Sequence, residues 1–189
     1  MQQNETTLKT FSGIHAPTPP DSSAATKLSG VGAFYIPLTQ GKVAIVDEED
    51  YKWLSQHKWC AHKEHNGDWY AIRNIYEHDK QTTIYMHREI LRPPEKMETD
   101  HKDGNGLNNQ RHNLRAATRS QNAQNRRKKK GVSRFKGVSW YGRIAKWQVS
   151  IRIKNKGVHL GYFSSEIEAA QAYDSVARRC FGEFACVNF

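Results

Sequence analysis

A run of basic residues divides the chain and sets the strongest limit on its fold. The run spans residues 126–136, contains no acidic residue, and carries Arg126, Arg127, Lys128, Lys129, Lys130, Arg134 and Lys136. A segment with this charge density is not buried in a hydrophobic core. Apolar residues lie on both sides of it, and 189 residues suffice for two small domains. We therefore predict two folded units joined by a basic linker over residues 128–134.

Charge and composition narrow the class of protein. The formal net charge is +10, but residues 1–100 sum to −3 and residues 101–189 to +13, which predicts a polyanionic partner for the second half. No apolar run reaches the roughly 20 residues of a membrane-spanning helix, so no membrane partner is expected. Three cysteines without a Cys-x-x-Cys pair argue against a disulfide scaffold or a Cys-based zinc finger. They are typical of a reducing, cytoplasmic or otherwise intracellular setting.

The first hundred residues are predicted to form a tail followed by a β-rich block. Residues 1–30 are rich in Ser, Thr, Ala and Pro, so we predict a disordered tail. Beyond it, alternating apolar segments and turn residues predict strands at 34–36, 42–46, 59–62, 69–76 and 82–86, with a hairpin turn at Asn66-Gly67. Short helices are predicted at 48–55, where Asp47 can act as the N-cap, and at 86–91. No chemistry is visible in this block, and we expect it to be a structural support for the polar segment after residue 98.

The composition changes to Asp, His, Gly and Asn between residues 98 and 113, and a helix is predicted from about residue 114 to 127. On that helix Arg115, Arg119, Asn122 and Arg126 would share one face. Arginines bind phosphate bidentately, and an Asn amide oxygen beside the Asp100 carboxylate would suit Mg²⁺. His101, next to Asp100, titrates near neutrality and can accept a proton from water.

The residues from His87 to Asn122 resemble the HNH, or ββα-metal, nuclease motif in the form carried by phage- and intron-borne homing endonucleases. The resemblance implies that Asp100 is a metal ligand, His101 the general base, Asn113 the residue that braces the loop, and Asn122 the second metal ligand. Further positions of the motif are matched by His87, Arg88, Asn105, Asn108, Asn109 and Arg111.

This resemblance implies hydrolysis of double-stranded DNA with one divalent ion, Mg²⁺ or another such as Mn²⁺, bound by Asp100 and Asn122. His101 would activate the attacking water. Phosphates beside the cleaved bond would be held by Arg115, Arg119, Arg126 and Arg127. A phage or mobile-element origin would fit this family. Nothing in the sequence implies a protein partner.

The last block of the chain has regular periodicity. Alternation around Trp147, Val149 and Ile151 predicts a half-buried strand, with further strands at 136–141 and 158–163. Ser165 and Glu168 have the spacing of a capping box, and the helix that they start is predicted to end at Gly182. Because Trp147 alternates with the apolar residues, we assign it to the core.

Residues 135–189 resemble the plant ethylene-response-factor, or APETALA-type, DNA-binding domain. The resemblance rests on Phe135-Lys136-Gly137-Val138-Ser139-Trp140, Lys146 to Arg152, His159 to Phe163, Glu168 to Asp174 and Asn188-Phe189. It implies a three-stranded antiparallel sheet, backed by one helix, that enters the major groove of DNA. Candidate DNA contacts are Lys136, Trp140, Arg143, Arg152 and Lys154. Ser139 and Gln148 depart from the plant pattern, so no base preference is transferred.

The sequence thus predicts an α+β protein in four parts: a tail at 1–30, a β-rich support with an HNH nuclease unit at 31–127, the linker at 128–134, and an APETALA-type domain at 135–189. The predicted function is a DNA endonuclease of the homing type that is targeted by its C-terminal domain. Two alternatives stay open at this point, a DNA-binding transcriptional regulator with an inactive HNH fold and an RNA-binding structural protein.

Overall fold

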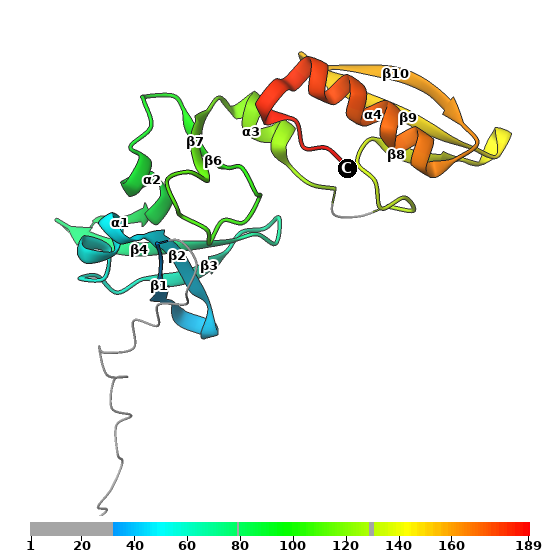
Figure 1. Ribbon diagram of the computed structural model, residues 1–189. Coiled ribbons are helices and arrows are strands. Elements are labelled where there is room, and N and C mark those ends of the chain that lie inside the picture. The colour runs from blue at the N-terminus through cyan, green and yellow to red at the C-terminus, as the bar shows by residue number, and fades with distance from the viewer. Residues whose placement is uncertain (1–31, 79, 129–130) are drawn as a thin grey trace, which may run out of the picture.

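The computed structural model describes residues 32–78, 80–128 and 131–189, which form two lobes (Figure 1). We call residues 33–125 the N-terminal lobe and residues 135–189 the C-terminal lobe. The described part of the chain combines small antiparallel sheets with four α-helices, so the fold is α+β, as predicted. The predicted tail, residues 1–30, lies outside the described residues. None of the described helices is long and apolar enough to cross a membrane.

The N-terminal lobe begins with a hairpin of β1 (Ala33–Pro37) and β2 (Val43–Asp47), followed by helix α1 (Glu48–Leu54). A three-stranded sheet of β3 (Cys60–Lys63), β4 (Trp69–Glu77) and β5 (Lys80–Tyr85) comes next, and helix α2 (Met86–Leu91) closes this part. These elements confirm the predicted strands and short helices. Asp47 occupies the N-cap position of α1, but its side chain forms no capping hydrogen bond.

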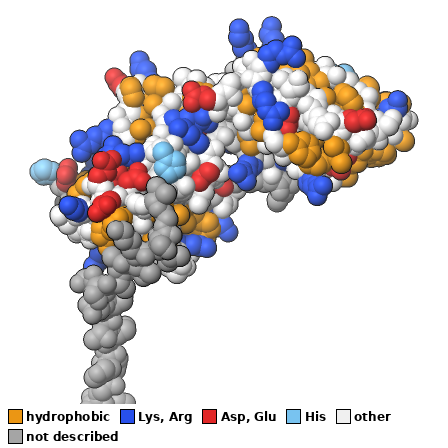
Figure 2. Space-filling view, viewed as in Figure 1, with side chains coloured by type: hydrophobic (Ala, Val, Ile, Leu, Met, Phe, Trp, Pro, Cys, Tyr) orange, Lys and Arg blue, Asp and Glu red, His pale blue; other side chains and the backbone are white. Residues whose placement is uncertain are grey.

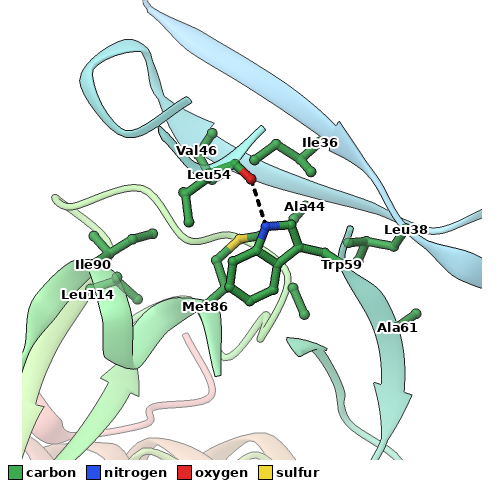
Figure 3. Close-up of a cluster of buried hydrophobic side chains, with 11 residues drawn as sticks. Ile36, Leu38, Ala44, Val46, Leu54, Trp59, Ala61, Met86, Ile90 and Leu114 are labelled. Atoms are coloured by element: carbon green, nitrogen blue, oxygen red, sulfur yellow. Dashed lines mark hydrogen bonds between the residues drawn. The ribbon is translucent and has the colours of Figure 1, made fainter. Parts of the chain in front are cut away.

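One hydrophobic core joins these elements (Figure 3). Trp59 lies at its centre, where the indole Nε1 donates a hydrogen bond to the Leu54 carbonyl at 2.9 Å. Figure 3 shows Met86 of α2 and Val46 of β2 in the same cluster, together with Leu114 from the segment that follows the polar loop. The core therefore also anchors that later segment, which places the polar loop against the β-rich block.

After α2 the chain forms a second hairpin, of β6 (Glu98–His101) and β7 (Leu114–Ala117), in which Asp100 lies opposite Arg115. Helix α3 (Arg119–Asn125) follows. The predicted helix over 114–127 is wrong at both ends, because residues 114–117 pair with β6 and a capping box of Thr118 and Gln121 starts the helix later. Arg115 and Arg126 therefore share no helix face with Arg119 and Asn122.

The C-terminal lobe has the predicted sheet and helix. Its strands β8 (Val138–Tyr141), β9 (Lys146–Ile153) and β10 (Lys156–Phe163) are antiparallel in the order β10-β9-β8, and helix α4 (Glu166–Phe181) covers one face. Small residues of α4 let it approach the sheet closely. Gly137 shows how close the packing is, since a Cβ there would lie 2.0 Å from the Tyr173 ring. Trp147 packs half-buried against this core, as predicted.

The two lobes contact each other directly. The Lys136 ammonium donates to the Gln124 carbonyl in the last turn of α3, and the Lys128 ammonium, from the segment between the lobes, donates to the Val138 carbonyl at 2.6 Å. The chain that leaves α4 passes beside α3 (Figure 1), where the short 3-10 turn η3 (Gly182–Phe184) meets the N-terminal lobe. These contacts bring the C-terminal lobe next to the hairpin that carries Asp100.

Candidate active site

Asp100 is the meeting point of three elements. It lies on β6 and is only 4% exposed. From β7, Nε of the Arg115 guanidinium donates to Asp100 Oδ2 at 2.8 Å, and Nη2 lies 2.7 Å from the same oxygen in an ion pair. From α3, the Asn125 amide nitrogen lies 3.0 and 3.1 Å from the two carboxylate oxygens and also donates to the His101 carbonyl. Oδ2 is thus heavily used, whereas Oδ1 keeps acceptor capacity for a further ligand.

His101 lies beside Asp100 and is 5% exposed. Its Nε2 is 3.4 Å from the amide oxygen of Asn109, and the Asn109 amide nitrogen donates to the Leu107 carbonyl, which fixes the orientation of this amide. Because an amide oxygen only accepts, Nε2 carries the proton and Nδ1 is left as the basic nitrogen. Burial lowers the pKa of His101 against the opposing effect of Asn109, so the ring is neutral at physiological pH.

His87 of α2 packs edge-on against His101, with ring centres 5.1 Å apart. The rings of Tyr70 and Tyr85 lie 5.5 and 5.4 Å from His87 and complete an aromatic wall. Burial, with a further contribution from His101, lowers the pKa of His87 to about 3. Among the described residues its Nδ1 has no hydrogen-bond partner. The wall therefore limits the access of water to one side of the His101 ring.

The polar loop after β6 is held together by its own amides. Asn113 accepts from the Asp103 amide and donates to the Asp103 carboxylate and to the Asn108 carbonyl, at 2.8–3.0 Å. Asp103 also accepts from the Asn105 amide and the Asn108 side chain. Burial pushes the pKa of Asp103 upward, but these hydrogen bonds outweigh it and hold the pKa below its ordinary value. Asn113 therefore braces the loop and does not contact the carboxylate of Asp100.

The β-rich block holds this loop from the other side. Ile45 of β2 exchanges backbone hydrogen bonds with Leu107 and Asn109. The Asp47 carboxylate accepts from the Gln110 side chain at 3.0 Å and from the Arg111 amide at 2.7 Å, which explains why it does not cap α1.

An ion pair between the half-exposed Arg111 and the buried Asp50 completes this attachment. The Arg111 guanidinium binds both oxygens of Asp50, which is 1% exposed, at 2.8 and 2.7 Å. Glu49 binds the same guanidinium at 2.6 Å. The acidic first turn of α1 therefore fixes the loop that orients Asn109 and, through it, His101. No role of this kind was visible in the sequence of residues 33–86.

The predicted metal ligand Asn122 does not contact Asp100 in this structure. Its amide donates to Glu98 at 2.6 Å, and Asn125, three residues further along α3, takes the position at Asp100. The sequence held a signal for Asn125, since residues three apart share one helix face. Among the predicted phosphate contacts, Arg119, Arg126 and Arg127 are exposed, whereas the Arg115 guanidinium is bound to Asp100.

Asn125 connects this centre to a basic hollow between the lobes. The hollow has a volume of about 520 Å³. Besides Asn125, its lining includes the basic side chains Lys102, Arg127, Lys128, Arg134 and Lys136. Figure 2 shows Lys and Arg side chains over the junction and the C-terminal lobe, while the acidic side chains of this face gather mainly on the N-terminal lobe. A polyanion can therefore approach Asp100 from the junction.

The donor set at Asp100 fits a hard divalent cation. The described residues contain no cluster of three or more His, Cys, Asp or Glu side chains that would form an all-protein metal cage. A carboxylate oxygen with open acceptor capacity is instead a ligand that Mg²⁺ accepts when water and substrate phosphates fill most of its octahedron. Asp100 and an amide of α3 would hold such an ion.

Comparison with known proteins identifies the family. A family model described as HNH endonuclease matches residues 92–124, which include Asp100, His101, Asn113 and Asn122. An uncharacterized HNH endonuclease of Acanthamoeba polyphaga mimivirus is 31% identical over 152 residues, which cover 79% of this chain and 76% of the relative. The chain belongs to the HNH endonuclease family. A divalent metal ion and a DNA substrate are general properties of HNH endonucleases.

Partial similarity links this HNH endonuclease to plant transcription factors. An AP2-like ethylene-responsive transcription factor of Arabidopsis thaliana is 42% identical over 62 residues, which are 32% of this chain and 11% of the plant protein. An ethylene-responsive transcription factor-like protein of the same plant is 48% identical over 40 residues, which are 21% of this chain and 18% of that protein. The likeness therefore concerns one module of these proteins.

Replacing Arg111 should detach the loop of the HNH endonuclease from α1. Arg111→Gln leaves the buried Asp50 carboxylate without its bidentate partner, and because the Arg111 side chain is itself 49% exposed this should lower the free energy of unfolding by about 1–2 kcal/mol. Arg119→Gln, which changes an exposed arginine of α3, should change it by less than about 0.5 kcal/mol. Urea unfolding measures both, and equal midpoints for the two variants would contradict the role given to this ion pair.

The buried His87 should make stability depend on pH. In the unfolded chain His87 takes up a proton near pH 6.5, whereas the folded protein resists protonation down to a pKa of about 3. Between these values the unfolded state binds more protons, so stability is full above pH 6.5 and falls as the pH falls, by up to about 1.4 kcal/mol per pH unit. His87→Leu should flatten this slope between pH 6.5 and 5 in urea unfolding. His57→Leu, at an exposed histidine, should leave the slope as in the wild type.

Proposed function

We propose that this HNH endonuclease hydrolyses phosphodiester bonds of duplex DNA with one divalent ion at Asp100 and with His101 as the general base. The observation that carries the proposal is the pairing of a buried carboxylate, with one oxygen still open, and an adjacent imidazole whose Nε2 faces the Asn109 amide oxygen.

In this proposal each residue has one task. Nδ1 of His101 accepts the proton of the attacking water, and Asn109 holds the ring in the tautomer that leaves Nδ1 basic. Arg119, Arg126 and Arg127 are exposed and bind phosphates on either side of the scissile bond. A bound Mg²⁺ or Mn²⁺ supplies charge stabilisation for the scissile phosphate and the leaving 3′ oxygen.

We assign the amide ligand of the ion to Asn125. The family resemblance predicts Asn122, but the contacts of Asn122 are with Glu98, whereas Asn125 lies within 3.1 Å of both oxygens of Asp100. An Asn amide that turns about its last side-chain bond presents its oxygen where its nitrogen was. Asn125 can thereby exchange its hydrogen bond with Asp100 for a metal contact.

Cleavage of a supercoiled plasmid tests this chemistry. Cutting should require Mg²⁺ or Mn²⁺. The first product should be nicked plasmid, because a single catalytic motif per chain cuts one strand at a time. His101→Ala should lower the rate by about 10²–10⁴-fold, and His62→Ala, at an exposed histidine, should not. Asn125→Ala should lower the rate more than Asn122→Ala. If no divalent ion supports cutting, or if His101→Ala cuts like the wild type, the protein is instead a DNA-binding regulator with an inactive HNH fold.

We further propose that the C-terminal lobe binds DNA through the outer face of its sheet. Helix α4 covers the other face, so the polar side chains of β9, among them Gln148, Ser150 and Arg152, point away from the core. Tyr162 packs against His159 and Tyr141, with ring centres 4.6 and 5.4 Å apart, and gives this face a rigid aromatic surface. The major groove admits such a β-surface.

The remaining predicted contacts divide into two groups. Arg143 and Lys154 are exposed in turns of the sheet, so both can reach phosphates or bases. Trp140 is 45% exposed at the end of β8, but it lies opposite Trp147 and packs on its ring, with 5.0 Å between ring centres, on the side of the sheet that α4 covers. Lys136 is half-buried with its ammonium on the Gln124 carbonyl, and burial lowers its pKa. We therefore keep Arg143, Arg152 and Lys154 as DNA contacts and give Trp140 and Lys136 structural roles.

Salt-dependent binding tests the sheet surface. Arg152→Gln should weaken binding to a duplex and reduce the slope of log affinity against log salt by about 1. Arg179→Gln makes the same charge change on the exposed side of α4 and should leave both quantities unchanged. Fluorescence anisotropy of a labelled duplex over a salt series measures them. Equal effects of the two variants would contradict the proposal, and tighter binding of RNA than of duplex DNA in competition would favour an RNA-binding protein.

A further inference from the structure

Arg115 links the candidate active site to the C-terminal lobe. Its side chain is 10% exposed, and while Nε and Nη2 bind Asp100, Nη1 donates to the backbone carbonyl of Glu183 at 2.5 Å. The Phe184 ring stacks on the same guanidinium, with 4.0 Å between the guanidinium carbon and the ring centre. The Glu183 carboxylate lies further away, at 3.5 Å. One arginine thus has the nuclease carboxylate on one edge and the C-terminal lobe on the other.

The residues that hold Arg115 are fixed to the C-terminal lobe. They form η3 directly after α4, and the carboxylate of the buried Asp174 on α4 binds the backbone amides of Asn188 and Phe189 beyond η3. Phe184 is half-buried but is not part of the hydrophobic cluster of the lobe, which includes its neighbours Phe181 and Ala185. The ring is therefore not needed to fill that core, and the contact that its position does serve is the one with Arg115.

The geometry at Asp100 gives this contact a consequence. A hydrogen bond from Nε of Arg115 and the ion-pair contact of its Nη2 both fall on Oδ2 and leave Oδ1 as the more open oxygen. A ligand carboxylate that is held in this way binds metal better, because its orientation is fixed before the ion arrives. A long arginine side chain loses much rotamer entropy when it is held in one place. The Phe184 ring and the Glu183 carbonyl restrict Arg115 in advance and reduce that loss.

We propose that Phe184 and the backbone carbonyl of Glu183 are positioning groups of the nuclease site, which hold Arg115 against Asp100. The C-terminal lobe then completes the metal site in addition to any contact that it makes with DNA. This inference rests on the proposed role of Asp100 as a metal ligand.

Binding of Mn²⁺ to the full-length protein without DNA provides the test. Arg115→Gln should weaken Mn²⁺ binding about 10–100-fold, the usual effect of losing a partner that orients a ligand. Phe184→Leu, which keeps apolar bulk and loses the ring face, should weaken it about three- to fivefold. Phe184→Tyr retains the ring and should bind Mn²⁺ like the wild type. Glu183→Gln keeps the carbonyl and changes only a side chain that is 70% exposed, and should also match the wild type.

A double variant separates positioning from general damage. Phe184→Leu should have no further effect in an Arg115→Gln background, because the ring acts through that guanidinium. If the two substitutions multiply their effects, or if Phe184→Tyr binds Mn²⁺ as weakly as Phe184→Leu, the proposal is overturned. Asp100→Ala should abolish Mn²⁺ binding, and unchanged binding in that variant would instead refute the proposed metal site itself. Rates of plasmid nicking at saturating Mn²⁺ should recover in Phe184→Leu, since the defect lies in metal affinity.

Discussion

The burial of one carboxylate, that of Asp100, is the constraint on which the arrangement of the site depends. A charge with 4% exposure is costly unless it is paired and hydrogen-bonded, and the chain satisfies it with an arginine from the opposite strand and an amide from the next helix. These partners force β6, β7 and α3 to meet at one point. They also decide the role of Arg115. An exposed arginine could bind phosphate, but this one is bound to Asp100.

Much of the fold was predictable because its strands and helices are determined by residues that lie close together in the sequence. The alternation around Val149 and the N-cap at Ser165 act over a few residues, and the C-terminal lobe has the predicted sheet and helix. Asp47 shows where such reasoning stops. Its position favours a helix cap, but its carboxylate binds Arg111, 64 residues later, and only the tertiary fold brings that partner within reach.

The type of chemistry at the site could be predicted from the sequence, but not which residues of each element meet there. The cluster around Asp100 and His101 indicated nuclease chemistry before any geometry was known, and the family match supports the nuclease. The predicted helix over 114–127 placed Arg115 beside Arg119 because a step of four residues fits a helix, but strand pairing with β6 competed for residues 114–117 and won. Asn125 lay within the predicted helix, but the family resemblance pointed to Asn122 as the ligand. Part of the acidic excess of residues 1–100 has a structural role, because Asp47 and Asp50 bind Arg111 and are not directed at solvent.

The contacts between the lobes limit how the nuclease unit can be fused to other domains. Such a fusion looks simple when the linker is only a tether. Here a fusion that exchanged everything after residue 134 would also remove the carbonyl of Val138 from Lys128, the ammonium of Lys136 from the end of α3, and the η3 turn from Arg115. The structural boundary of the nuclease lobe therefore does not coincide with the basic run, and a chimera that keeps the contacts of Arg115 would have to carry residues 182–184 along with the nuclease.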